Sequence, residues 1–278
     1  MATVPRNRFG STGVWSRREV LLGGLTAAFT LARAAQAGED VAAACALSPE
    51  LTEGPYYLDR PKLRRDITEG RPGVPLILRI RLLDGACRPL GGAAVDVWHC
   101  DALGAYSGYG GQSLAPPPGG PAMPRPPGAF GEPPPGKRGE RPPHPPITDR
   151  YRFLRGVQLT DAGGTAEFHT IVPGWYVGRA VHIHLKAHVG GKFAGHRYAG
   201  GHVCHTGQFG FAEDFYTSIS ALQPYARHQV ARTRLEQDGI LSPAGPVLKL
   251  AALGKEPAQG YLGTISFTAD PEAVPDGR

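Results

Sequence analysis

The sequence lacks several patterns that are typical of common functional classes. No two of its four cysteines are spaced as Cys-x-x-Cys, which argues against a zinc–thiolate site. Lysine and arginine are dispersed, without a basic stripe interleaved with aromatic residues, so nucleic acid is not expected as a partner. Aromatic residues make up only 8% of the 278 residues, whereas glycine (39) and proline (28) are frequent. This composition favours a loop-rich fold of strands over a helical bundle, with enough chain for one domain and extra segments.

The apolar run near the N-terminus is too short to span a membrane. It covers Val20–Leu31, follows the pair Arg17-Arg18, and is followed by the small residues of Ala35-Gln36-Ala37. This order resembles a twin-arginine export signal with its cleavage site. We therefore expect residues 1–37 to be an export signal and the protein to be periplasmic or extracellular. The mature domain, residues 38–278, is expected to carry no membrane span.

Without the expected export signal, residues 1–37, the chain is nearly neutral but keeps all of its cysteines. The formal charge of +6 falls to +2, because 25 basic and 23 acidic residues remain. All four cysteines also remain, and an even number in an oxidising destination predicts up to two disulfides. The sequence does not choose among the possible pairings, and buried free thiols are the competing interpretation for Cys45, Cys87, Cys100 and Cys204.

Short strand patterns, separated by turn residues, run along the mature chain. They lie at Leu76–Leu83, Ala94–Trp98, Phe153–Leu159, Thr165–Ile171, Arg179–His188, Pro246–Leu253 and Tyr261–Ala269, with one short helix expected within Ala212–Tyr225. Half of the 28 prolines fall between Pro116 and Pro146, so residues 114–147 are expected to be an insertion without regular structure, either a spacer or a cover for an active-site mouth. We predict an all-β fold, an antiparallel β-sandwich with long loops and at most short helices, with an open barrel as the alternative.

A candidate metal site lies in the strand pattern Arg179–His188. His182 and His184 alternate along it, so their side chains share one face and can bind one metal ion. Tyr176 lies just upstream and could reach the same point. The His-x-His pair alone is equally compatible with zinc, copper or iron, and with an ordinary strand whose polar face continues beyond the pair.

Four segments of the sequence together resemble the intradiol ring-cleavage dioxygenases, and most closely the secreted branch of that family. They follow the order found in the family and include the motifs Trp-His-Cys-Asp-Ala and Pro-Gly-Trp-Tyr, which are shared with that branch. The four segments are Glu53–Tyr57, Val95–Ser107, Phe168–His184 and His205–Gln208. The resemblance implies a β-sandwich that holds one non-haem Fe(III) through Tyr106, Tyr176, His182 and His184. Anionic phenolate oxygen stabilises the hard ferric ion over Fe(II), which agrees with this ligand set.

The resemblance also implies an activity, the cleavage of a catechol-type aromatic by O2 to a cis,cis-muconate-type product. In that reaction Tyr176 would leave the metal and take a proton as the substrate binds. Arg179 would stabilise negative charge on the ring, and Gln208 would form a hydrogen bond near the substrate. Tyr109, close to Tyr106 in the sequence, is expected to be a pocket or surface residue.

Two other functions remain compatible with the sequence. One is a zinc or copper enzyme that uses the His-x-His pair, although this leaves the two tyrosine motifs unexplained. The other is an exported sandwich protein that binds a ligand and has lost catalysis, against which stands the presence of all four implied ligands with Arg179 and Gln208. The sequence leaves open which catechol is the substrate, whether the protein is an oligomer, and whether Tyr56 and Tyr57 line the pocket or only pack.

Overall fold

The computed structural model describes residues 46–59, 61–110, 144–241 and 245–275. The strands are β1 (Pro75–Leu83), β2 (Ala94–Trp98), β3 (Arg155–Leu159), β4 (Thr165–Ile171), β5 (His182–Ala194), β6 (Arg197–Gly210), β7 (Lys249–Ala252) and β8 (Tyr261–Thr268). The helical segments are α2 (Glu213–Ser220) and the short 3-10 turns η2 (Tyr225–Arg227), η3 (Leu235–Gln237) and η4 (Pro257–Gln259). The expected export signal, Cys45 and most of the insertion at 114–147 lie outside the described residues.

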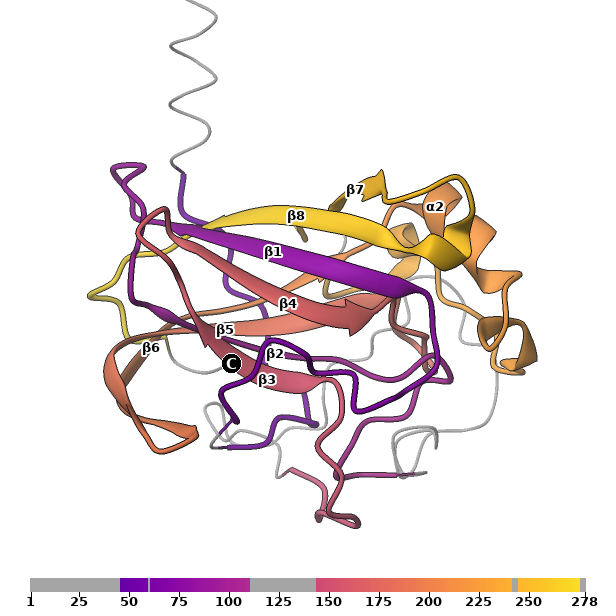
Figure 1. The fold of residues 1–278 in the computed structure, drawn as a ribbon, viewed down its shortest axis with the longest axis horizontal. Coiled ribbons are helices and arrows are strands. Elements are labelled where there is room, and N and C mark those ends of the chain that lie inside the picture. Colours follow the sequence, from indigo (N-terminus) through magenta and orange to yellow (C-terminus); the bar gives the residue numbers. More distant parts are fainter. Residues whose placement is uncertain (1–45, 60, 111–143, 242–244, 276–278) are drawn as a thin grey trace, which may run out of the picture. The chain divides into compact units, whose positions relative to one another are not determined.

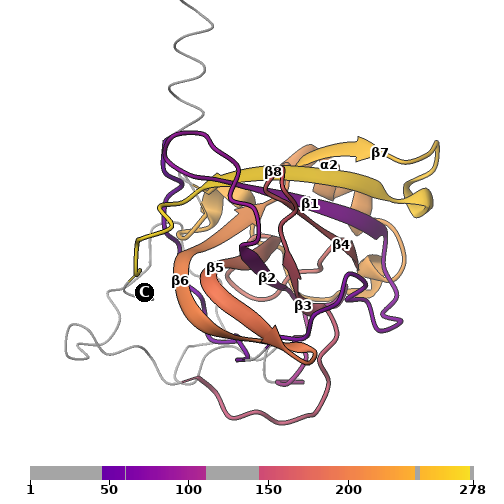
Figure 2. The ribbon, with the colours of Figure 1, turned by 60° about the vertical axis from the view of Figure 1, so that its left-hand side comes forward.

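Two four-stranded sheets face each other, which confirms the predicted β-sandwich (Figure 1). One sheet has the order β4-β1-β8-β7 and the other the order β3-β2-β5-β6. All neighbours are antiparallel except β1 and β8, which pair in parallel. Figure 2 shows the long β5–β6 hairpin beside β2 and β3, with β1 and β8 in the opposite layer.

The hydrophobic core lies between the sheets and is built by alternation along the strands. In β1 the residues Leu76, Leu78, Ile80 and Leu82 are buried, while Arg79 and Arg81 on the other face are exposed. The core also receives Ile183, Leu185 and Ala187 from β5 and Val181 from the position just before it, alternating as the pattern predicted. Because side chains alternate across a strand, His182 and His184 then point to the outer face of the same sheet.

The outer face of the sheet β3-β2-β5-β6 is covered by loops rather than solvent. All five residues of β2 are buried, which requires cover on both faces of that strand. Residues 47–59, 61–66 and 99–110 supply this cover; the centroid of the Tyr57 ring, for example, lies 4.8 Å from that of Trp98. The outer face is therefore a second, partly polar interior, in which side chains can be held without full exposure to water.

Three sequence predictions need correction. Strand β6 was missed, because Gly200, Gly201 and several polar residues break the apolar pattern, although β6 forms a long hairpin with β5. Arg179 precedes β5 rather than belonging to it, because the chain turns at Gly178, where φ is 81°. Only part of the disulfide prediction holds: Cys87 is disulfide-bonded, but the buried Cys100 and Cys204 are free thiols. No helix in the described part of the chain is long and apolar enough to cross a membrane.

Candidate metal centre

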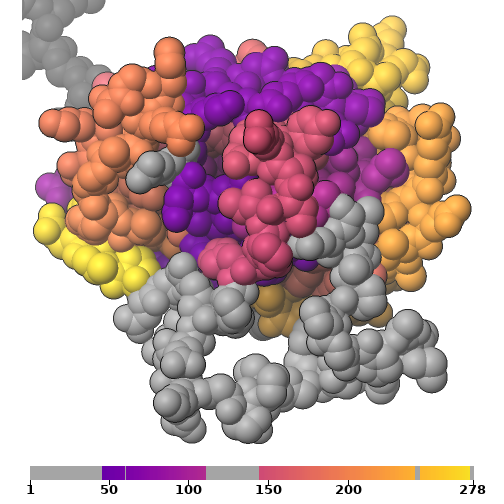
Figure 3. Space-filling model, turned by 90° about the horizontal axis from the view of Figure 1, so that it is seen from below, coloured from indigo at the N-terminus to yellow at the C-terminus, as the bar shows by residue number. Residues whose placement is uncertain are grey.

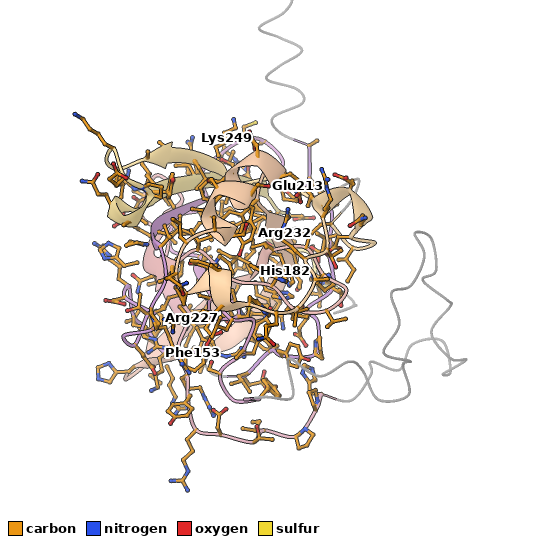
Figure 4. All side chains as sticks on the ribbon, turned by 90° about the vertical axis from the view of Figure 1, so that its right-hand side faces the viewer. Phe153, His182, Glu213, Arg227, Arg232 and Lys249 are labelled. Atoms are coloured by element: carbon orange, nitrogen blue, oxygen red, sulfur yellow. The ribbon has the colours of Figure 1, made fainter. Side chains whose placement is uncertain are left out.

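The four side chains implied as metal ligands come from three places on the covered face. His182 and His184 stand at the start of β5, Tyr106 lies in the loop after β2, and Tyr176 lies in the loop between β4 and β5. Three of them are almost fully buried, with exposed fractions of 0% for Tyr106 and 2% for each histidine. Tyr176 is only half-buried. Figure 4 shows His182 among the side chains in the interior.

The potential donor atoms of these four side chains converge on one point. His182 Nε2 lies 3.0 Å from His184 Nε2, 3.1 Å from the Tyr176 hydroxyl oxygen and 3.5 Å from the Tyr106 hydroxyl oxygen. Ligands about 2 Å from a single first-row metal ion lie about 3 Å from one another, so the spacing fits such an ion. The structure thus brings the two tyrosines and the two histidines together.

The surroundings orient the two imidazoles. His182 Nδ1 donates to the carbonyl oxygen of Ala180 at 2.6 Å, because a carbonyl can only accept; the Nε2 lone pair is then left for a ligand. The His184 ring stacks on the indole of Trp98, with the centroids 4.9 Å apart and the planes 7° apart. On its edge lies Gly54, where an added Cβ would be 3.2 Å from His184 Cε1. Backbone and aromatic contacts thus fix both rings before any ion is bound.

Burial decides the protonation of the four groups. It lowers the pKa of His182 to about 3, with a further contribution from the charge of Arg179, and it lowers the pKa of His184 well below the usual value. Both imidazoles are therefore neutral at pH 7 and able to bind a metal. Burial also raises the pKa of Tyr176 to about 12 and that of Tyr106 well above its usual range. A phenolate in this place needs a cation beside it, and a highly charged metal ion offsets the cost.

This donor set fits a hard metal ion and fits a zinc–thiolate or carboxylate site poorly. In the described ranges, no three His, Cys, Asp or Glu side chains cluster as metal ligands, so a metal centre has to include phenol oxygens. His184 Nδ1 is buried and has no hydrogen-bond partner within the described chain. The two phenols and two imidazoles could hold one metal ion.

Arg179 and Gln208 lie beside this cluster and bind each other. The Arg179 Nη2 group donates to Gln208 Oε1 at 2.6 Å, and Gln208 Nε2 donates to the carbonyl oxygen of Thr52 at 2.6 Å. The side chain of Arg179 is only 12% exposed, so it is not an ordinary surface arginine. Its charge lies close enough to Tyr176 and Tyr106 to lower their pKa values against the larger effect of burial.

Asp238 is a site residue that the sequence analysis missed. Its carboxylate, fully buried, accepts from Arg179 Nε at 2.9 Å and from the backbone N–H groups of Ala180, Ile240 and Leu241 at 2.7, 2.8 and 2.9 Å. Asp238 lies 59 residues from Arg179, and no local pattern marks it. It connects the loop after η3 to the turn before β5 and fixes the guanidinium.

The neighbouring tyrosines divide between the cluster and its support. Tyr56 stacks on Tyr106, with ring centroids 4.7 Å apart, and therefore borders the site. Tyr57 points away and donates to Asp96 Oδ2 at 2.9 Å. Tyr109 donates to the carbonyl oxygen of Tyr57 at 2.8 Å, so its hydroxyl supports the loop rather than joining the cluster.

Comparisons with family models and with solved structures both find dioxygenases. The family model described as Dioxygenase matches residues 51–118. The solved intradiol ring-cleavage dioxygenase from Tetranychus urticae is 30% identical, with 83% of this chain and 98% of that chain covered and a TM-score of 0.64. The dioxygenase domain of a dioxygenase–carbohydrate-binding fusion from Streptomyces sp. SirexAA-E is 26% identical, with 81% and 99% covered and a TM-score of 0.50. The comparison with curated proteins gives no match.

Proposed function

Because the chain belongs to the intradiol ring-cleavage dioxygenases, a family of oxidoreductases, we propose that it is an Fe(III)-dependent enzyme for a catechol-type substrate. The ion would be held by Tyr106, Tyr176, His182 and His184. The reaction would break the carbon–carbon bond between the two hydroxylated carbons and add both atoms of O2, giving a cis,cis-muconate-type diacid. The observation that carries this proposal is that His184 Nε2 and the two phenol oxygens all lie within 3.5 Å of His182 Nε2.

A ferric ion in this place would supply a Lewis acid that binds both oxygens of a catechol and withdraws electron density from its ring. The protein supplies different environments for the two phenols. Tyr106 is fully buried beneath Tyr56, so it is suited to remain a ligand throughout. Tyr176 is half-buried, on a loop that turns at Gly178, where an added Cβ would meet nothing within 4 Å. Of the two phenols, Tyr176 is therefore the less enclosed, and it would be the ligand better placed to leave the ion.

Tyr176 is also suited to accept a proton from the substrate. A catechol that binds through two oxygens has to lose two protons, and a phenolate that separates from the cation is a strong base. Burial raises the pKa of Tyr176 to about 12, so the free hydroxyl is protonated at neutral pH. Away from a cation, the Tyr176 hydroxyl oxygen would therefore hold a proton taken from the substrate.

Arg179 and Gln208 would act on the substrate ring. A guanidinium fixed by Asp238 and Gln208 is a preorganised positive charge, which stabilises negative charge on the ring as it develops. Gln208 is held at both ends of its amide, by Arg179 and by the carbonyl of Thr52. The two side chains thus form a rigid polar wall beside the ligands.

The visible spectrum of the iron-loaded protein tests the ligand set. Tyrosinate bound to Fe(III) gives a broad visible charge-transfer absorption, so we expect a coloured protein whose band shifts in Tyr106→Phe. Tyr109→Phe is the matched control, since within the described residues its hydroxyl bonds to the Tyr57 carbonyl and to none of the proposed ligands, and it should leave the band in place. A colourless protein with stoichiometric iron, or a band that responds to Tyr109→Phe instead, would refute the assignment.

Oxygen uptake with a panel of catechols, with product masses, tests the reaction. Uptake of one O2 per ring with a product heavier by both oxygen atoms is the expected result. Arg179→Met should retain iron and colour but turn over slowly. Tight binding of catechols without oxygen uptake would favour the alternative of a sandwich protein that has lost catalysis, and activity with zinc or copper alone would favour the other metalloenzyme.

We propose separately that the protein is exported. The order of the arginine pair, the apolar run and the small residues within 17–37 supports this. The disulfide at Cys87 supports it too, because disulfides persist in oxidising compartments. Replacement of the pair Arg17-Arg18 by lysines should keep the protein in the cytoplasm. Normal export of that variant, or an unprocessed N-terminus in the exported protein, would contradict the proposal.

A further inference from the structure

A cavity lies on the covered face, on the side of Trp98 toward Arg155, the residue that faces Trp98 across the sheet from His184. It has a volume of about 100 Å³ and does not include any of the four proposed ligands in its lining. Its lining comes from residues 57–59 and 61–64, from β2, from residues 152–155 and from the tip of the β5–β6 hairpin. Figure 3 looks onto this face, with the hairpin in orange and the segment around residue 150 in crimson.

The lining of this cavity, called here the basic cavity, carries an excess of positive charge. Five cationic side chains from three separate segments contribute to it: Lys62, Arg64, Arg152, Arg155 and Arg197. Two carboxyl groups of the lining oppose them, and Glu69, outside the lining, pairs with Arg64. One, Asp59, is exposed; the other, Asp96, is buried and bound by the Tyr57 hydroxyl, and burial raises the pKa of Asp96 to about 7. At neutral pH the lining therefore keeps a net positive charge.

Several hydrogen-bond donors around the basic cavity are uncommitted. Arg64 is largely committed, to Glu69 and to the carbonyls of residues 152 and 155. Arg155 gives Nε and Nη2 to Ser107, but its Nη1 has no bond within the described chain. In the same described part, the side chains of Lys62 and Arg197, brought together by a backbone bridge, form no hydrogen bond or ion pair.

Trp98 adds an independent indication of a ligand. Its indole Nε1 is a buried donor without a partner in the described residues, on a side chain that is 1% exposed. A buried N–H without an acceptor costs about 1–3 kcal/mol, so an unpaired donor in the lining of a cavity is best explained by a bound acceptor. Tyr57 and Trp98 also give the cavity an aromatic wall, beside Leu58 and Pro61.

We propose that the basic cavity binds a small organic carboxylate. The carboxylate oxygens would accept charge-assisted hydrogen bonds from the uncommitted donors, and the carbon skeleton would lie on the aromatic wall. The volume admits only a small molecule. The site is distinct from the proposed metal centre, from which the Trp98 ring separates it, one face of this ring being stacked on His184.

Calorimetric titration of the full chain tests the proposal, with benzoate, cis,cis-muconate and inorganic phosphate as probes. Benzoate or muconate should bind with one site per chain. Lys62→Gln and Arg197→Gln should each weaken that binding at least about tenfold, the usual effect of losing one charge-assisted bond. Both residues are exposed, so the variants should fold normally. Lys192→Gln, an exposed lysine of the same hairpin outside the cavity, should leave the affinity unchanged.

Three results would overturn the proposal. Equal affinity in Arg197→Gln and in the unmodified chain would mean that the cavity is not the site. Binding that is lost after the metal is removed by chelation, yet survives Arg197→Gln, would place the carboxylate on the metal. Binding of phosphate without binding of either carboxylate would make this an inorganic anion site. Because no turnover is measured, the outcome does not depend on whether the chain cleaves catechols.

Discussion

The buried pair of Arg179 and Asp238 allows the effect of one mutation to be worked out from the structure. In Asp238→Asn the shape of the side chain is retained, but Arg179 loses its carboxylate partner. The two side chains are 12% and 0% exposed, so water can hydrate the stranded guanidinium only in part. Removing one partner of a buried ion pair costs about 3–5 kcal/mol, since the remaining charge stays in a poorly solvated place.

The backbone contacts of Asp238 add to this cost. Its two oxygens accept three N–H groups besides the guanidinium, and the amide of asparagine replaces one acceptor oxygen by a donor. We therefore expect Asp238→Asn to lower the free energy of unfolding by about 4 kcal/mol, a large part of the roughly 5–15 kcal/mol of an ordinary domain. Turnover should fall as well, because Arg179 is no longer fixed beside Gln208.

Urea unfolding of Asp238→Asn, Arg179→Met and the double variant measures this effect. The double variant removes the stranded charge, so it should be more stable than the sum of the single changes predicts. The visible band should persist in Asp238→Asn while kcat falls, because no proposed ligand is altered. A loss below about 1 kcal/mol, or strictly additive single changes, would show that the pair does not hold Arg179 in place.

Two further predictions concern the support of the site and the pH dependence of folding. Gly54→Ala should reduce iron content, because φ is +72° and the new Cβ would press on His184 at 3.2 Å. The control is Gly70→Ala, which has the same backbone strain (φ +73°) but no atom within 4 Å of the new Cβ, and which should retain iron. Equal loss of iron in both variants would contradict the prediction. Burial lowers the pKa of His99 from its usual 6.5 to about 4, so its stabilising contribution is complete above pH 6.5 and is lost as the pH falls to 4. Unfolding measured against pH should show about 3 kcal/mol of loss in the unmodified chain that is missing in His99→Gln; parallel profiles would refute this.

Much of the fold could be predicted from the sequence because its strands alternate clearly. Ala94–Trp98 and Thr165–Ile171 were predicted with the observed ends, and the apolar and polar faces of β5 lie as the pattern indicated. Strand β6 could not be found in this way, since its outer half is glycine-rich and gains its stability from pairing with β5. The tertiary context, not the local preference, decides its structure.

The candidate site shows a similar division between local and distant information. The tyrosines and histidines could be found because they lie in short motifs, and the structure brings their side chains together. The position of Asp238 could not be predicted, because it contacts Arg179 from a segment far away in sequence. The buried ion pair between Lys186 and Glu53 likewise joins distant segments, so no local spacing predicts it. The same limit applies to Cys87 and Cys100, whose different states follow from position in the fold rather than from the count of cysteines.

The alternation of β5 has a consequence for insertions and deletions. A shift of one residue against β2 would turn Ile183 toward the loops and the histidines into the core, so the register is fixed by both layers at once. Beyond Ala187 the pairing with β6 shifts at a bulge, and this irregularity resets the alignment of the outer half of the hairpin. Insertions or deletions in the hairpin past residue 188 should therefore leave the register of its inner half unchanged. One added or lost residue between positions 182 and 186 would instead disrupt both the packing of the core and the positions of the two histidines.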